Sequence, residues 1–181
     1  MTDELVHLTV DDGVATITLD SPRNRNALSR QLLDELEARL AAVAADEAAR
    51  VAVLAATGST FCAGADLSEA AAGSMEEGAR RLLALLRSIV ALPKPVVARV
   101  HGNVRAGGIG LVAACDVAVA AEDAGFAFSE ARLGLTPAVI SVAVLPRMTD
   151  RAGARYFLGG DAFDGREAAR TGLVTEAVAE A

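Results

Sequence analysis

The sequence predicts an α/β fold in which most of the strand pairing is parallel. Two short segments, 51–56 and 96–100, are almost wholly apolar, which is typical of strands buried on both faces of a sheet. Segments with helical periodicity follow them, and this alternation of strand and helix is characteristic of α/β architectures. A chain of 181 residues is long enough to bury a core, and we expect one domain over 1–181.

The first elements are a hairpin and a capped helix. Residues 5–10 and 14–20 alternate apolar and polar side chains around the turn sequence DDG, which is a strong hairpin signal. After the turn-like stretch SPRNRNAL, Ser29 is suited to cap a helix. The apolar residues of that helix recur at three- and four-residue steps: Leu32, Leu33, Leu36, Leu40 and Val43.

The middle of the chain alternates strands, loops and helices. The strand 51–56 leads into the loop TGSTFCAGADL and then a helix over 75–91, which Pro93 and Pro95 stop. The strand 96–100 follows, and the stretch RAGGIG then opens a short buried helix.

The last part of the chain continues the same alternation. DVAVA is a strand, FAFSEARLGL a small separate segment, and helical patterns cover 138–148 and 149–158. Gly159 and Gly160 end the second of these helices, and a strand is expected over 173–178.

Composition and charge exclude several classes of protein. The net charge is −7 and no basic stripe with interleaved aromatic residues is present, so nucleic-acid binding is not expected. No apolar run reaches the length of a membrane span, and the N-terminal residues lack the pattern of a signal peptide. Cys62 and Cys115 stand alone without metal-like spacing, which favours a reducing, cytoplasmic location and predicts no metal site.

Two glycine-containing loops follow the buried strands. CAGAD comes after 51–56 and RAGGIG after 96–100, where α/β folds place their ligands. If both loops open helices, two backbone N–H groups could point at one oxygen atom and form an oxyanion hole without side chains. Glycine suits this role because a bare backbone can approach a ligand closely. The alternative is that these are ordinary turns between strand and helix.

Other side chains have two interpretations each. Glu130 lies in an apolar neighbourhood and either faces solvent or carries a raised pKa fit for proton transfer. His101 and Ser129 could form a base and nucleophile, but no GxSxG elbow is present, and His101 is better explained as structural. Cys62 is interpreted as small apolar filler, and Asp66 as a capping residue.

A dinucleotide site is a further alternative. Residues 108–113 match GxGxxA, with Glu130 about twenty residues later in the chain. In that fingerprint the first glycine directly follows a strand, whereas here several residues separate it from 96–100. The pattern therefore argues against a nicotinamide cofactor.

Several spaced motifs together resemble the enoyl-CoA hydratase/isomerase (crotonase) family. They are STFCAGADL, HGNVRAGGIGLVAACDVAVA, FAFSEARLGLTPA and FLGGDAFDGREAARTGLV, and SPRNRNALS is similar as well. The resemblance covers essentially the whole chain. It implies a spiral of ββα units that binds acyl-CoA thioesters and stabilises an enolate anion, with coenzyme A as part of the substrate and no separate cofactor.

The resemblance also implies roles for individual residues. The N–H groups of Ala65 and Gly107 would form the oxyanion hole, and Glu130 falls on the family's acid/base glutamate. The remaining positions implied to bind substrate are Ala63, Asp66 and Leu67 near the adenine, Arg23 and Arg25 near the phosphates, and Gly108 and Gly110 in the glycine loop.

Gly110 bears on the reaction type. Hydratases of the family usually hold a water between two glutamates, and the first of these aligns with Gly110, which has no side chain. Isomerases of the family resemble the one-glutamate arrangement. The stretches VRAGGIGLVAACD and FSEARLGLTPAVIS are nevertheless most similar to methylglutaconyl-CoA and related hydratases. If the substrate carries a distal carboxylate, as this similarity implies, Arg105 or Arg132 of this chain could pair with it.

We therefore expect hydration of a 2-enoyl-CoA. The alternatives are conversion of a 3-enoyl-CoA to a 2-enoyl-CoA, and a catalytically silent acyl-CoA binder. Family members usually continue with a C-terminal helical segment that closes the acyl pocket and helps to form trimers. That segment is expected to be missing here, and the full-length chain is expected to form a trimer or hexamer.

Overall fold

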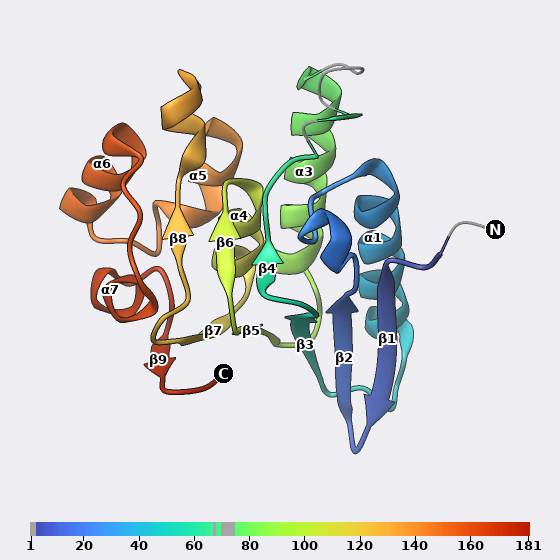
Figure 1. Cartoon of the computed structure of the whole chain (residues 1–181). Coiled ribbons are helices and arrows are strands. Elements are labelled where there is room, and N and C mark those ends of the chain that lie inside the picture. Colours follow the sequence, from blue (N-terminus) through green and yellow to red (C-terminus); the bar gives the residue numbers. More distant parts are fainter. Residues whose placement is uncertain (1–2, 67, 70–74) are drawn as a thin grey trace.

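The computed structural model describes residues 3–66, 68–69 and 75–181 and contains two β-sheets flanked by helices (Figure 1). The larger sheet has the strand order β1-β2-β3-β5-β7-β9, and the smaller has the order β4-β6-β8. Only β1 and β2 pair antiparallel; the other pairs are parallel. The strands are β1 (Val6–Asp11), β2 (Val14–Leu19), β3 (Val51–Ala56), β4 (Thr60–Cys62), β5 (Val96–Val100), β6 (Asn103–Arg105), β7 (Val117–Ala121), β8 (Phe126–Ala127) and β9 (Glu176–Val178).

The helices lie between the strands in sequence and pack against one another in space. Helix α1 contacts α3, α3 contacts α4, and α5 contacts both α3 and α4 (Figure 1). None of the helices in the described ranges is long and apolar enough to cross a membrane. Their bounds are η1 (Pro22–Asn24), α1 (Arg30–Ala45), α3 (Met75–Val90), α4 (Gly107–Ala114), η2 (Ser129–Leu133), α5 (Ala138–Val144), α6 (Asp150–Gly159) and α7 (Gly165–Thr171).

A ββα unit repeats along the chain. In β3-β4-α3 and in β5-β6-α4, the first strand joins the large sheet, the second joins the small sheet, and a helix follows. The strands β7 and β8 repeat the pattern, with η2 and α5 in place of the single helix. The predicted α/β class and the spiral of ββα units are therefore confirmed.

The hairpin and the capped helix form as predicted. Strand β1 pairs with β2 from Val6↔Leu19 to Asp11↔Val14. Asp12 (φ 44°) and Gly13 (φ 82°) both take positive φ at the turn, as a tight two-residue hairpin requires. At the start of α1, the Leu32 N–H donates to Ser29 Oγ over 3.2 Å. The apolar stripe of α1 is buried in the core.

Several boundaries differ from the prediction because short elements carry no periodicity. Residues 60–62 were expected as part of a loop and form β4, and residues 103–105, for which no strand was expected, form β6. Pairing defines both strands: β4 pairs with β6, and β6 also pairs with β8. The expected helix 138–148 stops as α5 at Val144, and the expected strand 173–178 is reduced to β9. Helix α7 was not predicted; Asp164 caps it by accepting a hydrogen bond from the Glu167 N–H over 2.8 Å.

Candidate active site

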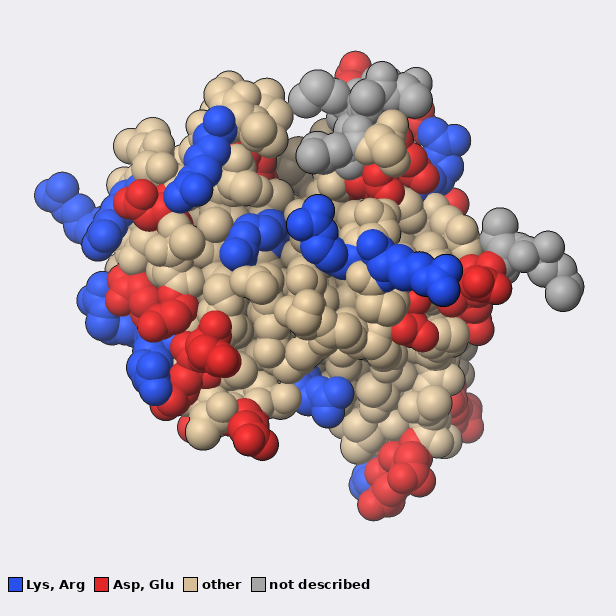
Figure 2. Space-filling view, viewed as in Figure 1, with Lys and Arg blue, Asp and Glu red and all other residues tan. Residues whose placement is uncertain are grey.

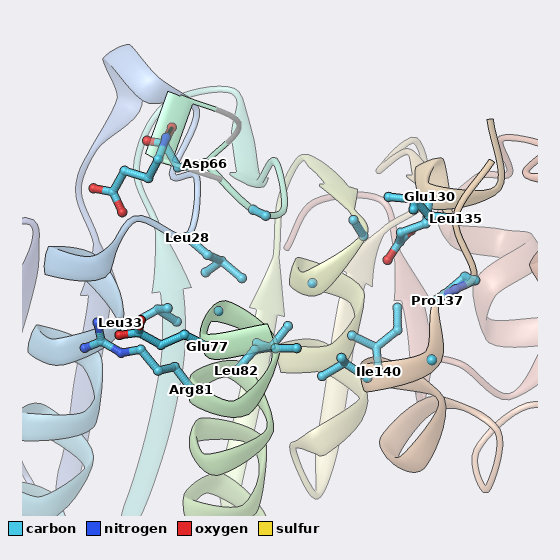
Figure 3. A pocket seen from close by; sticks show the side chains of 18 of the residues that line it. Leu28, Leu33, Asp66, Glu77, Arg81, Leu82, Glu130, Leu135, Pro137 and Ile140 are labelled. Atoms are coloured by element: carbon cyan, nitrogen blue, oxygen red, sulfur yellow. Dashed lines mark hydrogen bonds between the residues drawn. The ribbon is translucent and has the colours of Figure 1, made fainter. Parts of the chain in front are cut away.

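A pocket of about 570 Å³ opens between two groups of elements. One wall comes from α1, α3 and the loops around them, and the other comes from η2 and α5 (Figure 3). Most of the lining is apolar, and charged side chains stand on the α1 and α3 side, where Arg81 is paired with Asp34. The apolar lining includes Leu28, Leu33, Leu82, Leu135, Pro137 and Ile140. Such a lining suits a mainly hydrophobic ligand.

Ala65 presents its backbone to this pocket. It forms a parallel bridge with Leu28, in which the Leu28 N–H donates to Gly64 O over 2.7 Å and Leu28 O accepts from the Asp66 N–H over 3.4 Å. Because these two bonds use the groups on either side of Ala65, its own N–H faces away from Leu28. Ala65 is exposed and lines the pocket, and its N–H is not used in the bridge to Leu28.

Gly107 also lines the pocket. It is the first residue of α4, where the N–H groups have no partner within the helix and the helix dipole is positive. Ala106 before it takes φ 47°, which turns the chain sharply from β6 into the helix. A Cβ on Gly64 would lie 2.8 Å from Ala106 Cβ, so the loops that carry Ala65 and Gly107 touch. Glycine at position 64 (φ 90°) permits this approach.

Glu130 brings a carboxyl group into an apolar part of the pocket. It lies on η2, and its side chain points into the pocket, toward Ile140 on α5 (Figure 3). Its Oε2 is buried and has no hydrogen-bond partner within the described ranges. Burial raises the pKa of this carboxyl above its ordinary value of 4.5. A buried carboxyl with a raised pKa is suited to accept and return a proton.

Asn26, whose role the sequence did not reveal, fixes the segment that leads to the Ala65 loop. It is fully buried, and its Nδ2 donates to Thr57 O over 3.0 Å and to Thr60 O over 2.8 Å. Its Oδ1 accepts from the Ser21 N–H over 2.7 Å. The side chain thus ties the segment before α1 to the strand that leads to Ala65. An asparagine in a turn directly before apolar residues was the available signal.

Of the other described residues predicted on the Ala65 loop, Asp66 lines the pocket and Ala63 does not. Asp66 lines the pocket, and Asp66 Oδ1 accepts from the Ser68 N–H over 2.9 Å, which agrees with the predicted capping role. Ala63 is half-buried and donates its N–H to Arg25 O over 3.0 Å. Leu67 lies outside the described residues.

Gly108 and Gly110 are buried inside α4 and face packed side chains. A Cβ on Gly108 would lie 2.7 Å from the Cβ of Cys62, so this glycine lets α4 pack against β4. A Cβ on Gly110 would lie 2.6 Å from Ile140 Cγ2. Neither glycine is among the described residues that line the pocket. Both therefore act through packing in this structure.

The predicted arginines are not brought into the pocket. Arg23 and Arg25 are exposed on and just after η1. Arg105 donates to the carbonyl oxygens of Val104 and Gly125, and Arg132 Nε donates to the Gly160 carbonyl oxygen over 2.9 Å. Figure 2 shows basic side chains in a row across the face viewed, flanked by acidic groups. Because the Arg105 and Arg132 side chains donate to backbone carbonyl oxygens and do not line the pocket, the structure gives no support for their pairing with a substrate carboxylate.

The alternative sites have structural explanations. His101 Nε2 bonds to Gly58 O over 2.6 Å, so the ring holds a loop. Burial raises the pKa of the Cys62 thiol to about 12, as expected for apolar filler. Strand β6 stands between β5 and α4, so the GxGxxA match lacks the direct step from strand to helix that a dinucleotide fingerprint needs.

The comparison with protein families decides the assignment. The model of the family described as enoyl-CoA hydratase/isomerase matches residues 9–181. The chain belongs to this family. The family resemblance that the sequence motifs carried is therefore confirmed, whereas the methylglutaconyl-CoA hydratase-like subgroup stays a prediction.

Individual family members resemble the chain closely in sequence and fold. The crystal structure of an enoyl-CoA hydratase from Mycobacterium avium is 49% identical with a TM-score of 0.90, over 98% of this chain and 71% of that one. A probable enoyl-CoA hydratase of Bacillus subtilis is 35% identical over 94% of this chain and 67% of its own length. A hydroxycinnamoyl-CoA hydratase-lyase of Pseudomonas fluorescens is 35% identical over 96% of this chain and 66% of its own length. The chain therefore spans about two thirds of the length of these relatives.

Proposed function

We propose that this member of the enoyl-CoA hydratase/isomerase family binds an acyl-CoA thioester in the pocket and hydrates a 2-enoyl-CoA. The observation that carries the proposal is the buried Glu130 oxygen, which has no hydrogen-bond partner among the described residues, in a pocket that Ala65 and Gly107 also line. The relatives named as enoyl-CoA hydratases support hydration over other reactions of a thioester.

Each group has a defined part in the reaction. Glu130 takes a proton from water while the water oxygen bonds to C3, and the electrons of the double bond move toward the thioester oxygen. The N–H groups of Ala65 and Gly107 stabilise the enolate oxygen, and a donor of this type contributes about 3–4 kcal/mol to the transition state. Glu130 then returns its proton to C2, which completes the addition. The apolar lining excludes competing water and strengthens the two N–H bonds.

Isomerisation of a 3-enoyl-CoA is the second candidate. It is favoured by one observation, that the position of the usual first glutamate is Gly110, so one carboxylate stands alone. In this reaction Glu130 would remove a proton from C2 and return it to C4, with the same two N–H groups on the dienolate oxygen. A catalytically silent acyl-CoA binder is the third alternative.

Three measurements separate the three functions, and the first tests hydration. Loss of the enoyl-thioester absorbance is followed with crotonyl-CoA and with 3-methylglutaconyl-CoA, for the wild-type chain, for Glu130→Gln and for Glu37→Gln. Glu37 is an exposed residue of α1 and provides the same chemical change away from the pocket. Hydration predicts absorbance loss that Glu130→Gln reduces about 10²–10⁴-fold and Glu37→Gln leaves unchanged.

The other outcomes are equally specific. If neither 2-enoyl-CoA loses absorbance, but the enoyl-thioester absorbance rises when a 3-enoyl-CoA is added and this rise depends on Glu130, the reaction is isomerisation and not hydration. If neither reaction occurs while isothermal titration shows acyl-CoA binding, the chain is a binder only. Failure to bind any acyl-CoA would refute the whole proposal.

The assembly is proposed on a separate observation. Large apolar side chains are exposed on η2, α5 and α6, among them Leu133 at 64% and Leu158 at 84% exposed. Burial of these side chains between subunits would remove apolar surface from water. We expect the protein to form the trimer or hexamer that the family resemblance implies, and light scattering after size-exclusion chromatography measures this directly.

A further inference from the structure

Ile140 occupies the space in front of Gly110. A Cβ placed on Gly110 would lie 2.6 Å from Ile140 Cγ2, 3.1 Å from Ile140 Cβ and 3.4 Å from Leu86 Cδ1. Real atoms do not approach this closely, so position 110 accepts no side chain while α5 stays where it is. The glycine and the isoleucine are thus two parts of one contact between α4 and α5.

The same isoleucine forms part of the pocket wall. Ile140 is buried at 1% exposure and lines the pocket, whereas Gly110 behind it does not. In Figure 3 the Ile140 side chain projects from α5 into the pocket that the Glu130 carboxylate enters from η2. The wall in front of position 110 therefore presents hydrocarbon to the pocket.

This wall is stiff as well as apolar. Isoleucine is branched at Cβ, which restricts its side-chain rotation on a helix. Leu86, buried at 1%, also lies beside the contact, so the side chain cannot retreat toward α4. A rigid hydrocarbon surface discriminates between ligands by size, because a longer ligand fits only if it displaces the isoleucine or leaves its extra methylene outside the pocket.

We propose that Ile140 is a specificity-determining residue that sets the size of the acyl group accepted beside Glu130. The proposal rests on the proposed function, since it assumes that the pocket holds the acyl part of a CoA thioester. In this arrangement Ile140 forms a floor for the acyl chain, and Gly110 exists because α5 must approach α4 closely enough to place that floor.

The test measures binding of saturated esters, which do not turn over. Dissociation constants for butyryl-CoA and octanoyl-CoA are determined by isothermal titration for the wild type, Ile140→Ala and Ile140→Val. The matched control is Ile89→Ala, the same change at a residue of α3 that is buried at 2% and is not among the described residues lining the pocket. Circular dichroism checks the fold of each variant.

Ile140→Ala is expected to shift the ratio of the two dissociation constants toward octanoyl-CoA by about tenfold or more, since one methylene in an apolar pocket changes discrimination by about 10–200-fold. Ile140→Val, which removes one methyl group, should shift it less and in the same direction, and it serves alone if the alanine variant does not fold. Ile89→Ala should leave the ratio unchanged.

Two results would overturn the proposal, and only the second would also overturn the proposed function. If the Ile140 variants leave the ratio unchanged, or the control shifts it equally, Ile140 does not set acyl size although the proposed function stands. If the wild type binds neither ester, the proposed function fails and this proposal falls with it.

Discussion

Substituting Gly110 by alanine probes the contact between α4 and α5 without adding any polar group. In an isolated helix the change would be favourable, because alanine in a helix interior is about 1 kcal/mol better than glycine. In this protein the new methyl group would lie 2.6 Å from Ile140 Cγ2 and 3.1 Å from Ile140 Cβ. Since Ile140 Cβ is fixed to the α5 backbone, a change of rotamer cannot relieve both contacts.

The magnitude follows from these distances. Carbon atoms in ordinary contact are separated by about 3.5–4.0 Å, so α5 must move by roughly 1 Å at this point. Inserting a methylene into a packed core costs about 1–3 kcal/mol. After subtraction of the gain in helix propensity, Gly110→Ala should reduce the free energy of unfolding by about 1 kcal/mol.

A double-mutant cycle isolates the contact. In the background of Ile140→Ala, which lacks Cγ2 and keeps only the Cβ contact at 3.1 Å, the same Gly110→Ala change should be close to neutral, giving a coupling energy of about 1 kcal/mol between the two positions. Ile140→Val keeps both the Cβ and the γ methyl group that make the contact, so Gly110→Ala should still destabilise in that background. Urea unfolding followed by far-UV circular dichroism provides the free energies.

Two results would refute this reasoning. If Gly110→Ala stabilises the wild-type chain, α5 does not press against α4 at this position. If the valine background behaves like the alanine background, the γ methyl group is not the atom that excludes a side chain from position 110.

Three further predictions concern the pocket and the core. Burial raises the pKa of Glu130 above 4.5, so as pH rises through the interval between that value and the raised pKa the unfolded chain releases a proton that the native state keeps, and stability falls. The free energy of unfolding of Glu130→Gln should therefore exceed that of wild type at neutral pH, and the difference should shrink as pH falls to about 4.5. Urea unfolding at a series of pH values measures both free energies, and a difference that does not depend on pH would contradict this prediction. Asn26→Ala removes the partner of one buried and two half-buried backbone groups and should lower the free energy of unfolding by about 2–3 kcal/mol, whereas Asn24→Ala, at an exposed residue, should lower it by about 1 kcal/mol or less. Equal losses in the two variants would contradict the assigned role of Asn26. Since burial raises the pKa of Cys62 and of Cys115 to about 12, neither thiol should react with Ellman's reagent at pH 8 in the native protein, and both should react in denaturant; a native thiol that reacts would show that its site opens.

Much of the fold could be predicted because its signals are local. The hairpin turn, the Ser29 cap and the apolar stripe of α1 each depend on residues within a few positions of one another. The buried strands β3 and β5 were recognisable from composition alone. Strands β4 and β6 were missed because three residues contain no periodicity, and their partners lie far away in sequence.

The candidate site divides in the same way. The motif pattern brought out Ala65, Gly107 and Glu130 by their positions along the chain, and in the structure all three line one pocket. Their chemical roles stay predictions. The sequence could not show that Arg105 bonds to backbone carbonyls, since those oxygens become neighbours only when β6 and β8 pair.

The sequence by itself determined the fold class, the family and the candidate residue for proton transfer, Glu130, because turn chemistry, helix periodicity and spaced motifs act over short stretches of chain. Only the tertiary structure decided what surrounds them. The pocket walls come from α1, α3 and α5, and the isoleucine that faces Gly110 is thirty positions away from it in sequence. Burial, close contact and the raised pKa of Glu130 all depend on how distant elements pack, and no local pattern encodes those distances.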